Sequence, residues 1–238
     1  MTENVKEESR PEVDFTAAGA WIGFRQSLPV ALSVFAYGLV FGVLAKQANL
    51  SFLEALLMSV LVFAGASQFT ALGLWVVPLP SLTIILTTFI INLRHILMGA
   101  SLYPYIRHLK TLPRNVILYF MSDESWALTM GQFQSGKRNG AFLLGSGFVI
   151  GLGWWGSTVV GYLLGNLIEH PEQWGLDFAF LAVFIALLVA QWKGKKNILP
   201  WLVAGIVAVV AKFLLPDKWY ILLGGLAGSL VGAWLNDD

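Results

Sequence analysis

Residues 55–93 form a run of 39 positions without a formal charge, and the run ends at Arg94. As one α-helix rising about 1.5 Å per residue, the run would extend roughly 58 Å, about twice the ~30 Å hydrocarbon core of a bilayer. Only the Pro-Leu-Pro segment at 78–80 interrupts it, and proline disrupts the interior of a helix. The run therefore predicts two antiparallel membrane spans, 55–77 and 81–102, joined by a tight turn.

The composition places the whole chain in the membrane. Of its 238 residues, 57% are hydrophobic and 12% are charged, about half of the roughly 25% charged residues usual in soluble domains. The absence of cysteine excludes disulfides, thiolate catalysis and cysteine-based metal sites. A net charge of +1 without a basic stripe argues against a nucleic-acid partner. We predict no cofactor and no metal site.

The charged residues divide the chain into seven clear spans and one weak span, 115–133. We therefore predict an all-α fold, a polytopic transmembrane helix bundle with seven or eight spans, over residues 21–238. Residues 1–20 are rich in charge and are expected to form a disordered polar tail. The predicted spans are 26–45, 55–77, 81–102, 115–133, 141–168, 178–192, 197–215 and 219–234.

The distribution of positive charge leaves the topology open. The basic loops at 137–138 and 193–196 favour the cytoplasm, and the acidic loop at 169–177 favours the outside. The basic loop at 103–114 also favours the cytoplasm, which would make 115–133 a re-entrant hairpin and place the N-terminus outside. If 115–133 crosses instead, the N-terminus is cytoplasmic and the loop at 103–114 departs from the rule.

Two glycine-containing segments, 37–42 and 160–165, resemble one another, and each precedes a turn and a further apolar segment. This similarity is compatible with an internal repeat, since transporters often consist of repeated halves around a midplane site. It is equally compatible with the general likeness of glycine-rich apolar helices.

A first polar cluster contains Ser67 and Gln68 behind Gly65 and Ala66. Gln68 lies ten residues before Pro78, roughly 15 Å along a helix and therefore near the bilayer centre. Gly65 and Ala66 permit close approach or unwinding of the helix. The two polar side chains are candidates to bind a ligand, although small and polar residues also serve helix packing.

A second polar cluster contains Asn92, Arg94 and His95. Asn92 follows Pro80 by 12 residues, or roughly 18 Å of helix, and so reaches a depth similar to that of Gln68. An arginine and a histidine inside a span are costly and mark functional sites by default. Arg94 at a headgroup, reached by snorkelling, is the alternative. His95 is a candidate proton carrier because imidazole titrates near neutral pH.

A third polar cluster contains Asp123, Glu124 and Ser125 within the weak span. Adjacent carboxylates inside a membrane require a counter-charge or contact with water, and Arg94 and His95 are the available interior cations. If the segment lies at the surface instead, the two acids are simply solvated.

Together these clusters supply a cation, an imidazole, carboxylates, an amide and hydroxyls within an apolar body. A zwitterion fits such a site, with its carboxylate at Arg94 or at exposed helix N–H groups and its ammonium at Asp123 or Glu124. Proton movement through His95 or the acids would couple transport to the proton gradient. A channel, or a transporter for another small polar solute, would use the same groups to line a pore. An enzyme is disfavoured, because the sequence holds no His-Glu-x-x-His or Gly-x-Ser-x-Gly motif.

Three motifs carry a resemblance to a known family: Gly65-Ala66-Ser67-Gln68-Phe69, Asn92-Leu93-Arg94-His95 with Gly99-Ala100-Ser101-Leu102, and Asp123-Glu124-Ser125-Trp126-Ala127-Leu128. They are similar to motifs of the AzlC family, the large subunit of bacterial branched-chain amino-acid exporters. The resemblance implies a multi-pass protein of the cell inner membrane that exports branched-chain or similar hydrophobic amino acids. It also implies a small membrane partner of the AzlD type. An ATPase subunit is not implied, since no phosphate-binding loop is present.

Overall fold

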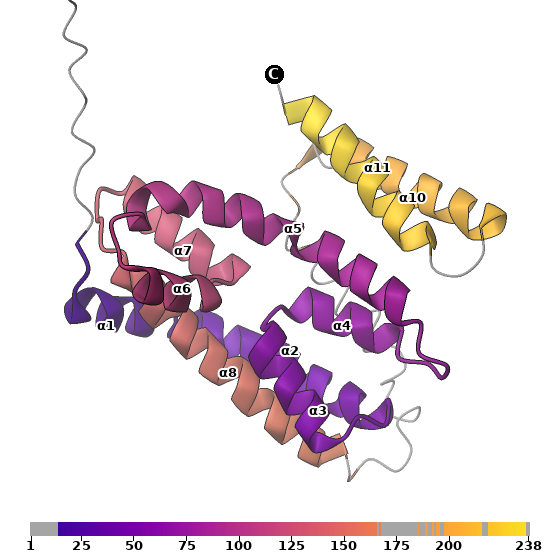
Figure 1. The fold of residues 1–238 in the computed structure, drawn as a ribbon, viewed down its shortest axis with the longest axis horizontal. Coiled ribbons are helices and arrows are strands. Elements are labelled where there is room, and N and C mark those ends of the chain that lie inside the picture. Colours follow the sequence, from indigo (N-terminus) through magenta and orange to yellow (C-terminus); the bar gives the residue numbers. More distant parts are fainter. Residues whose placement is uncertain are drawn as a thin grey trace, which may run out of the picture. The chain divides into compact units, whose positions relative to one another are not determined.

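The computed structural model describes residues 14–165, 198–215 and 219–236, with isolated residues between 166 and 197. The described residues are arranged almost entirely in helices (Figure 1), and the predicted all-helical class is confirmed. The elements are α1 (Ala17–Gln26), α2 (Leu28–Gln47), α3 (Phe52–Leu57), the π-helix η1 (Met58–Val62), α4 (Gly65–Gly73), α5 (Ser81–Ile106), α6 (Thr111–Tyr119), α7 (Asp123–Gln134), α8 (Ala141–Gly165), α10 (Ile198–Leu214) and α11 (Trp219–Asn236).

Three of the described helices, α2, α5 and α8, are long and apolar enough to cross a membrane. The shorter apolar segments are Phe52–Val62, Ile198–Leu214 and Leu223–Leu235. The predicted total of seven or eight spans stays a prediction, and the predicted span at 178–192 lies outside the described residues.

The chain divides into two compact units. The first unit comprises Met1–Phe35 and Arg94–Trp154, and the second comprises Ala36–Leu93 and Trp155–Asp238. The three long helices α2, α5 and α8 each contribute one part to each unit.

The predicted span 55–77 is not one helix, which corrects the prediction. Within the second unit, α3 continues as the π-helix η1 and stops at Phe63, whose φ of 44° is left-handed, before α4 begins at Gly65. Gln68 Nε2 donates a hydrogen bond of 3.2 Å to Ser59 Oγ. Nine residues of straight helix would separate these two residues by roughly 13 Å, so the bond requires a sharp bend at Phe63. Hydropathy alone does not reveal such a bend, because both arms are apolar.

The weak span 115–133 is also interrupted. Within the first unit, α6 ends at Tyr119 and α7 starts at Asp123. Three contacts join α7 to α5, and they occur in the same order along both helices. They join Asp123 to Arg94 at 2.9 Å, Trp126 Nε1 to Ser101 Oγ at 2.9 Å, and the Phe133 ring to Tyr105 with centroids 4.4 Å apart.

The order of these contacts means that α7 runs parallel to the second part of α5. Helix α6 must then return from the end of α5 to the level of Arg94, where the chain turns into α7. The loops at 107–110 and 135–140 consequently lie at the same end of the first unit. This geometry is the one that the re-entrant alternative for 115–133 requires.

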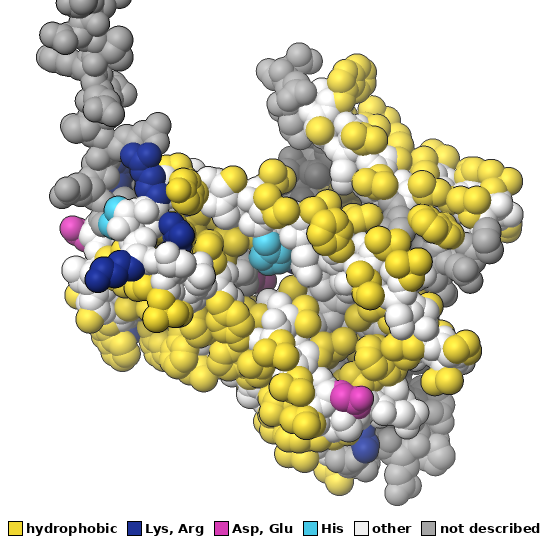
Figure 2. Space-filling view, in the orientation of Figure 1, with side chains coloured by type: hydrophobic (Ala, Val, Ile, Leu, Met, Phe, Trp, Pro, Cys, Tyr) yellow, Lys and Arg dark blue, Asp and Glu magenta, His cyan; other side chains and the backbone are white. Residues whose placement is uncertain are grey.

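An apolar core holds these helices of the first unit together. It consists of Met98, Leu102, Ile106, Ile117, Met121, Phe133 and Leu143. Outside this core, hydrophobic side chains cover much of the visible face of the described residues, whereas Lys and Arg side chains gather at the end of the first unit where α5 ends (Figure 2). An apolar exterior with a charged end is typical of a helix bundle embedded in a lipid bilayer.

The start of α1 differs from the predicted tail at 1–20. Thr16 caps α1 by accepting a hydrogen bond of 3.1 Å from the Gly19 N–H, and Asn139 Nδ2 donates to the Thr16 hydroxyl at 2.8 Å. The helix therefore begins at Ala17, inside the range predicted to be disordered. Residues 1–13 lie outside the described part.

The two similar glycine segments contact each other in the second unit. A Cβ atom at Gly42 of α2 would overlap the carbonyl oxygen of Thr158, and one at Gly161 of α8 would overlap that of Leu39. The similarity of the segments is thus accounted for by close packing of two helices. An internal repeat stays a prediction.

Candidate functional site

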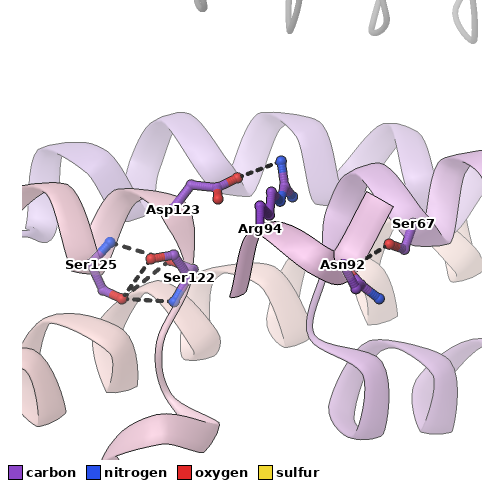
Figure 3. Close-up of polar contacts among 6 residues, drawn as sticks. All are labelled: Ser67, Asn92, Arg94, Ser122, Asp123 and Ser125. Atoms are coloured by element: carbon purple, nitrogen blue, oxygen red, sulfur yellow. Dashed lines mark hydrogen bonds and ion pairs between the residues drawn. The ribbon is translucent and has the colours of Figure 1, made fainter. Parts of the chain in front are cut away.

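The Arg94 guanidinium and the Asp123 carboxylate form an ion pair in the first unit. Nη1 of Arg94 lies 2.9 Å from Oδ2 of Asp123, and the two side chains are 32% and 43% exposed (Figure 3). Arg94 lies on α5, and Asp123 begins α7, where the helix dipole also favours a negative charge. The counter-charge expected for Arg94 is therefore present, and it is Asp123. Arg94 Nε is buried and donates to no described atom.

The neighbours of this pair differ in their exposure. Glu124 is exposed in the first turn of α7, next to Asp123. His95 is half-buried, directly after Arg94 on α5. Both positions are compatible with the roles predicted for them, a carboxylate facing an ammonium and an imidazole beside the ion pair.

Ser125 is placed in the helix cap rather than at an open surface. It is fully buried, and its Oγ accepts a hydrogen bond of 2.8 Å from the Ser122 N–H. In return, Ser122 Oγ accepts from the Ser125 N–H at 3.3 Å (Figure 3). This reciprocal capping satisfies two backbone donors at the interruption between α6 and α7. The hydroxyl of Ser125 fixes the start of α7 and with it the position of Asp123.

Ser67 and Asn92 form a second polar pair, within the second unit. Ser67 Oγ donates a hydrogen bond of 2.8 Å to Asn92 Oδ1 (Figure 3). Ser67 is fully buried in the first turn of α4, and Asn92 is half-buried on α5. The sequence predicted similar depths for the polar residues on either side of the proline turn; the depth stays a prediction, and the bond shows that Ser67 and Asn92 are in contact.

Gln68 contacts residues that sequence reasoning missed. It is 1% exposed, and its amide nitrogen binds Ser59. Ser59 in turn contacts Thr158 and Trp155 of α8. One feature of the sequence could have indicated these residues: Trp155 and Thr158 lie in the middle of a glycine-rich span, whereas tryptophan usually lies near span ends.

The described residues contain no group of three or more His, Cys, Asp or Glu side chains placed to hold a metal ion. The polar groups of the site are the ion pair, the imidazole, the amides and the hydroxyls.

Comparison with known proteins identifies the family of this chain. The family model described as AzlC protein matches residues 29–168. This range extends from the second residue of α2 to beyond the end of α8 and includes all eight predicted site residues. The chain belongs to the AzlC family. AzlC proteins have a membrane transport role, and this chain is a multi-pass protein of the cell inner membrane.

Individual relatives cover most of the chain. An uncharacterized membrane protein of Archaeoglobus fulgidus is 30% identical over 214 residues, which are 89% of this chain and 93% of the relative. The branched-chain amino acid transport protein AzlC of Bacillus subtilis is 25% identical over 183 residues, covering 74% and 71%. The inner membrane protein YgaZ of Escherichia coli is 27% identical over 215 residues, covering 87% of each chain. No solved structure matches the chain significantly.

Proposed function

We propose that this protein is a secondary, proton-coupled exporter of branched-chain or similar hydrophobic amino acids. We further propose that it acts as the large subunit of a two-component system with a small membrane subunit of the AzlD type. The observation that carries the proposal is the ion pair between Arg94 and Asp123, which holds two opposite charges on side chains that are 32% and 43% exposed.

A zwitterion can replace each partner of this ion pair with one of its own charges. A guanidinium binds a carboxylate through two parallel hydrogen bonds, so Arg94 would take the substrate carboxylate. Asp123, with the exposed Glu124 beside it, would take the substrate ammonium. The exchange keeps every charge paired, which matters because an unpaired charge in a membrane is costly.

An apolar substrate side chain suits the surroundings of the pair. Met98 and Leu102 follow Arg94 on α5 by one and two helical turns, and Met121 precedes Asp123 by two residues; all three belong to the apolar core of the first unit. The name of the Bacillus subtilis relative, a branched-chain amino acid transport protein, supports the same substrate class.

Proton coupling would use His95. Imidazole is the side chain whose usual pKa lies closest to neutrality, and His95 adjoins Arg94. A change in its charge beside the ion pair would alter how strongly Arg94 holds Asp123 or a substrate carboxylate. Export driven by the gradient then requires an intact imidazole at position 95.

The proposal is tested by leucine transport in proteoliposomes that contain this chain and its small subunit. An imposed pH gradient should drive radiolabelled leucine against its concentration gradient, and Arg94→Gln should reduce the initial rate at least about tenfold, the effect of losing one charge-assisted hydrogen bond. Arg107→Gln, an equal change at an exposed arginine after α5, is the control and should retain the rate.

Two results would contradict the proposal. Leucine flux that only runs down its own gradient would favour a channel. Unchanged transport in Arg94→Gln, with normal amounts of both proteins in the membrane, would show that the ion pair does not take part in transport.

A further inference from the structure

A buried hydrogen-bond cluster fastens the sharp bend before α4. Ser59, at the second position of η1, is fully buried and shares a hydrogen bond of 2.9 Å with the Thr158 hydroxyl. The same Ser59 oxygen accepts from Gln68 Nε2 at 3.2 Å. The Ser59 carbonyl accepts from Trp155 Nε1, also at 3.2 Å. Ser59 therefore connects three elements, η1, α4 and α8, within the second unit. We call Ser59, Gln68, Trp155 and Thr158 the hub.

The hub compensates for the missing side-chain cap at the start of α4. The described helices α3 and α7 both begin with a reciprocal cap made by a serine side chain. At the start of α4, Ala64 occupies the cap position and no side chain caps the helix. Because the first turn of a helix has backbone donors without partners in the helix, its orientation here depends on other contacts. The bond from Gln68 to Ser59 provides one of them.

The α8 side of the hub is anchored by aromatic packing as well. The Trp155 ring lies 5.8 Å from the ring of Phe63, the residue at the bend. Thr158 is 1% exposed. Its segment of α8 packs closely against Gly42 of α2. The hub is thus attached to α2 and α8, two helices whose backbones are in close contact, and this contact makes it a firm support for α4.

We infer that Ser59, Trp155 and Thr158 are positioning residues for transport. They hold Gln68, and through it the first turn of α4, so that Ser67 reaches Asn92. This inference rests on the proposed function and deepens it. It also gives Gln68 a positioning role through Ser59, because one N–H of its buried amide donates to Ser59 Oγ.

The test uses substitutions at the α8 side of the hub. Thr158→Val removes the hydroxyl at nearly constant volume, and Thr158→Ser keeps the hydroxyl. Trp155→Phe removes the indole N–H together with one of its two rings. Thr87→Val is the control, because Thr87 is equally buried, at 1%, but donates only to Thr83 of its own helix. Leucine transport is measured in proteoliposomes as KM and Vmax, together with the amount of folded protein.

Thr158→Val and Trp155→Phe should raise KM about tenfold, the consequence of losing one buried hydrogen bond, while Vmax per folded protein changes less than about twofold. Thr158→Ser should remain close to the wild type in KM. Unchanged KM in Thr158→Val, or an equal rise in the control Thr87→Val, would overturn the inference.

A second measurement does not depend on the substrate. The chain contains no cysteine, so Ala66→Cys places a single thiol in the first turn of α4. Its alkylation rate should rise about fivefold or more when Thr158→Val is added, and should not change with Thr87→Val. An unchanged rate in Thr158→Val would overturn the positioning role. If the wild type fails to transport leucine, the proposed function fails, and the alkylation rates still decide whether the hub holds α4.

Discussion

The Arg94 and Asp123 side chains are 32% and 43% exposed. A transport site opens to water, and an ion pair in contact with water stabilises a protein by about 1 kcal/mol or less. The same exposure leaves both charges accessible to a substrate. Transport should therefore depend on the pair far more strongly than stability does.

Asp123→Asn tests this difference. The substitution keeps the shape and removes the charge, so we expect the export rate of leucine to fall at least about tenfold and the free energy of unfolding to change by about 1 kcal/mol or less. Asp14→Asn, a matched change at an exposed carboxylate, should leave both quantities unchanged. Loss of export in parallel with an equal loss of folded protein would show that Asp123 serves folding alone.

Ser122 is a single residue that is expected to affect folding rather than transport. Its Oγ accepts from the Ser125 N–H at the start of α7, and replacing a capping serine by alanine costs about 1 kcal/mol. We expect Ser122→Ala to lower the free energy of unfolding by that amount and Ser122→Asn to retain most of it. Equal stability of Ser122→Ala and the wild type in reversible unfolding experiments would contradict the role of the cap.

At the scale of elements, the parallel packing of α2 and α8 depends on glycine. A Cβ atom at Gly161 would overlap the carbonyl oxygen of Leu39, whereas a Cβ atom at Gly156 of the same helix would meet nothing within 4 Å. We expect Gly161→Ala to destabilise the protein by about 1–3 kcal/mol, the usual cost of overpacking. Gly156→Ala should be neutral or stabilising by up to about 1 kcal/mol. Thermal unfolding in detergent measures both, and equal effects would refute the close contact.

The starts of two helices could be predicted from the sequence, whereas the bend before α4 and its contacts could not. The proline at position 80 and the charges after 136 locate the starts of α5 and α8, because both act locally on the backbone and on burial. The bend at Phe63 is invisible to hydropathy, since both of its arms are apolar. The contact of Ser59 with Thr158 joins residues 99 positions apart, and buried hydroxyls in apolar helices give no spacing pattern. The sequence could match Arg94 or His95 with Asp123 or Glu124 because an interior charge requires a partner, and the structure shows that the pair is Arg94 with Asp123.

At the scale of the molecule, the first unit constrains the membrane topology. The Asp14 N–H donates to the Arg138 carbonyl at 3.0 Å, and the Tyr105 ring stacks on Phe133. The chain before α1, the loop after α5 and the loop after α7 therefore lie at one end of this unit. Both loops are basic, so the positive-inside rule assigns this end to the cytoplasm.

The number of crossings between Thr16 and the end of α5 must then be even. Helices α2 and α5 are the two long apolar helices in that interval, and we expect each of them to cross once. The bent segment 52–73 would then enter the membrane and return to the side from which it came, as the segment 111–134 does. This arrangement keeps both basic loops in the cytoplasm together with the N-terminus, a combination that neither sequence-based alternative allowed.

Single cysteines test this topology directly, because the native chain has none. His108→Cys and Ser135→Cys report on the loops after α5 and α7, and both positions are exposed. Val77→Cys, at a position that is 94% exposed, lies before α5, and the 26 residues of α5 span roughly 39 Å. A membrane-impermeant maleimide should label His108→Cys and Ser135→Cys only in inside-out vesicles, and Val77→Cys only in right-side-out vesicles. Labelling of His108→Cys and Ser135→Cys from opposite sides would mean that the α6–α7 segment crosses the membrane.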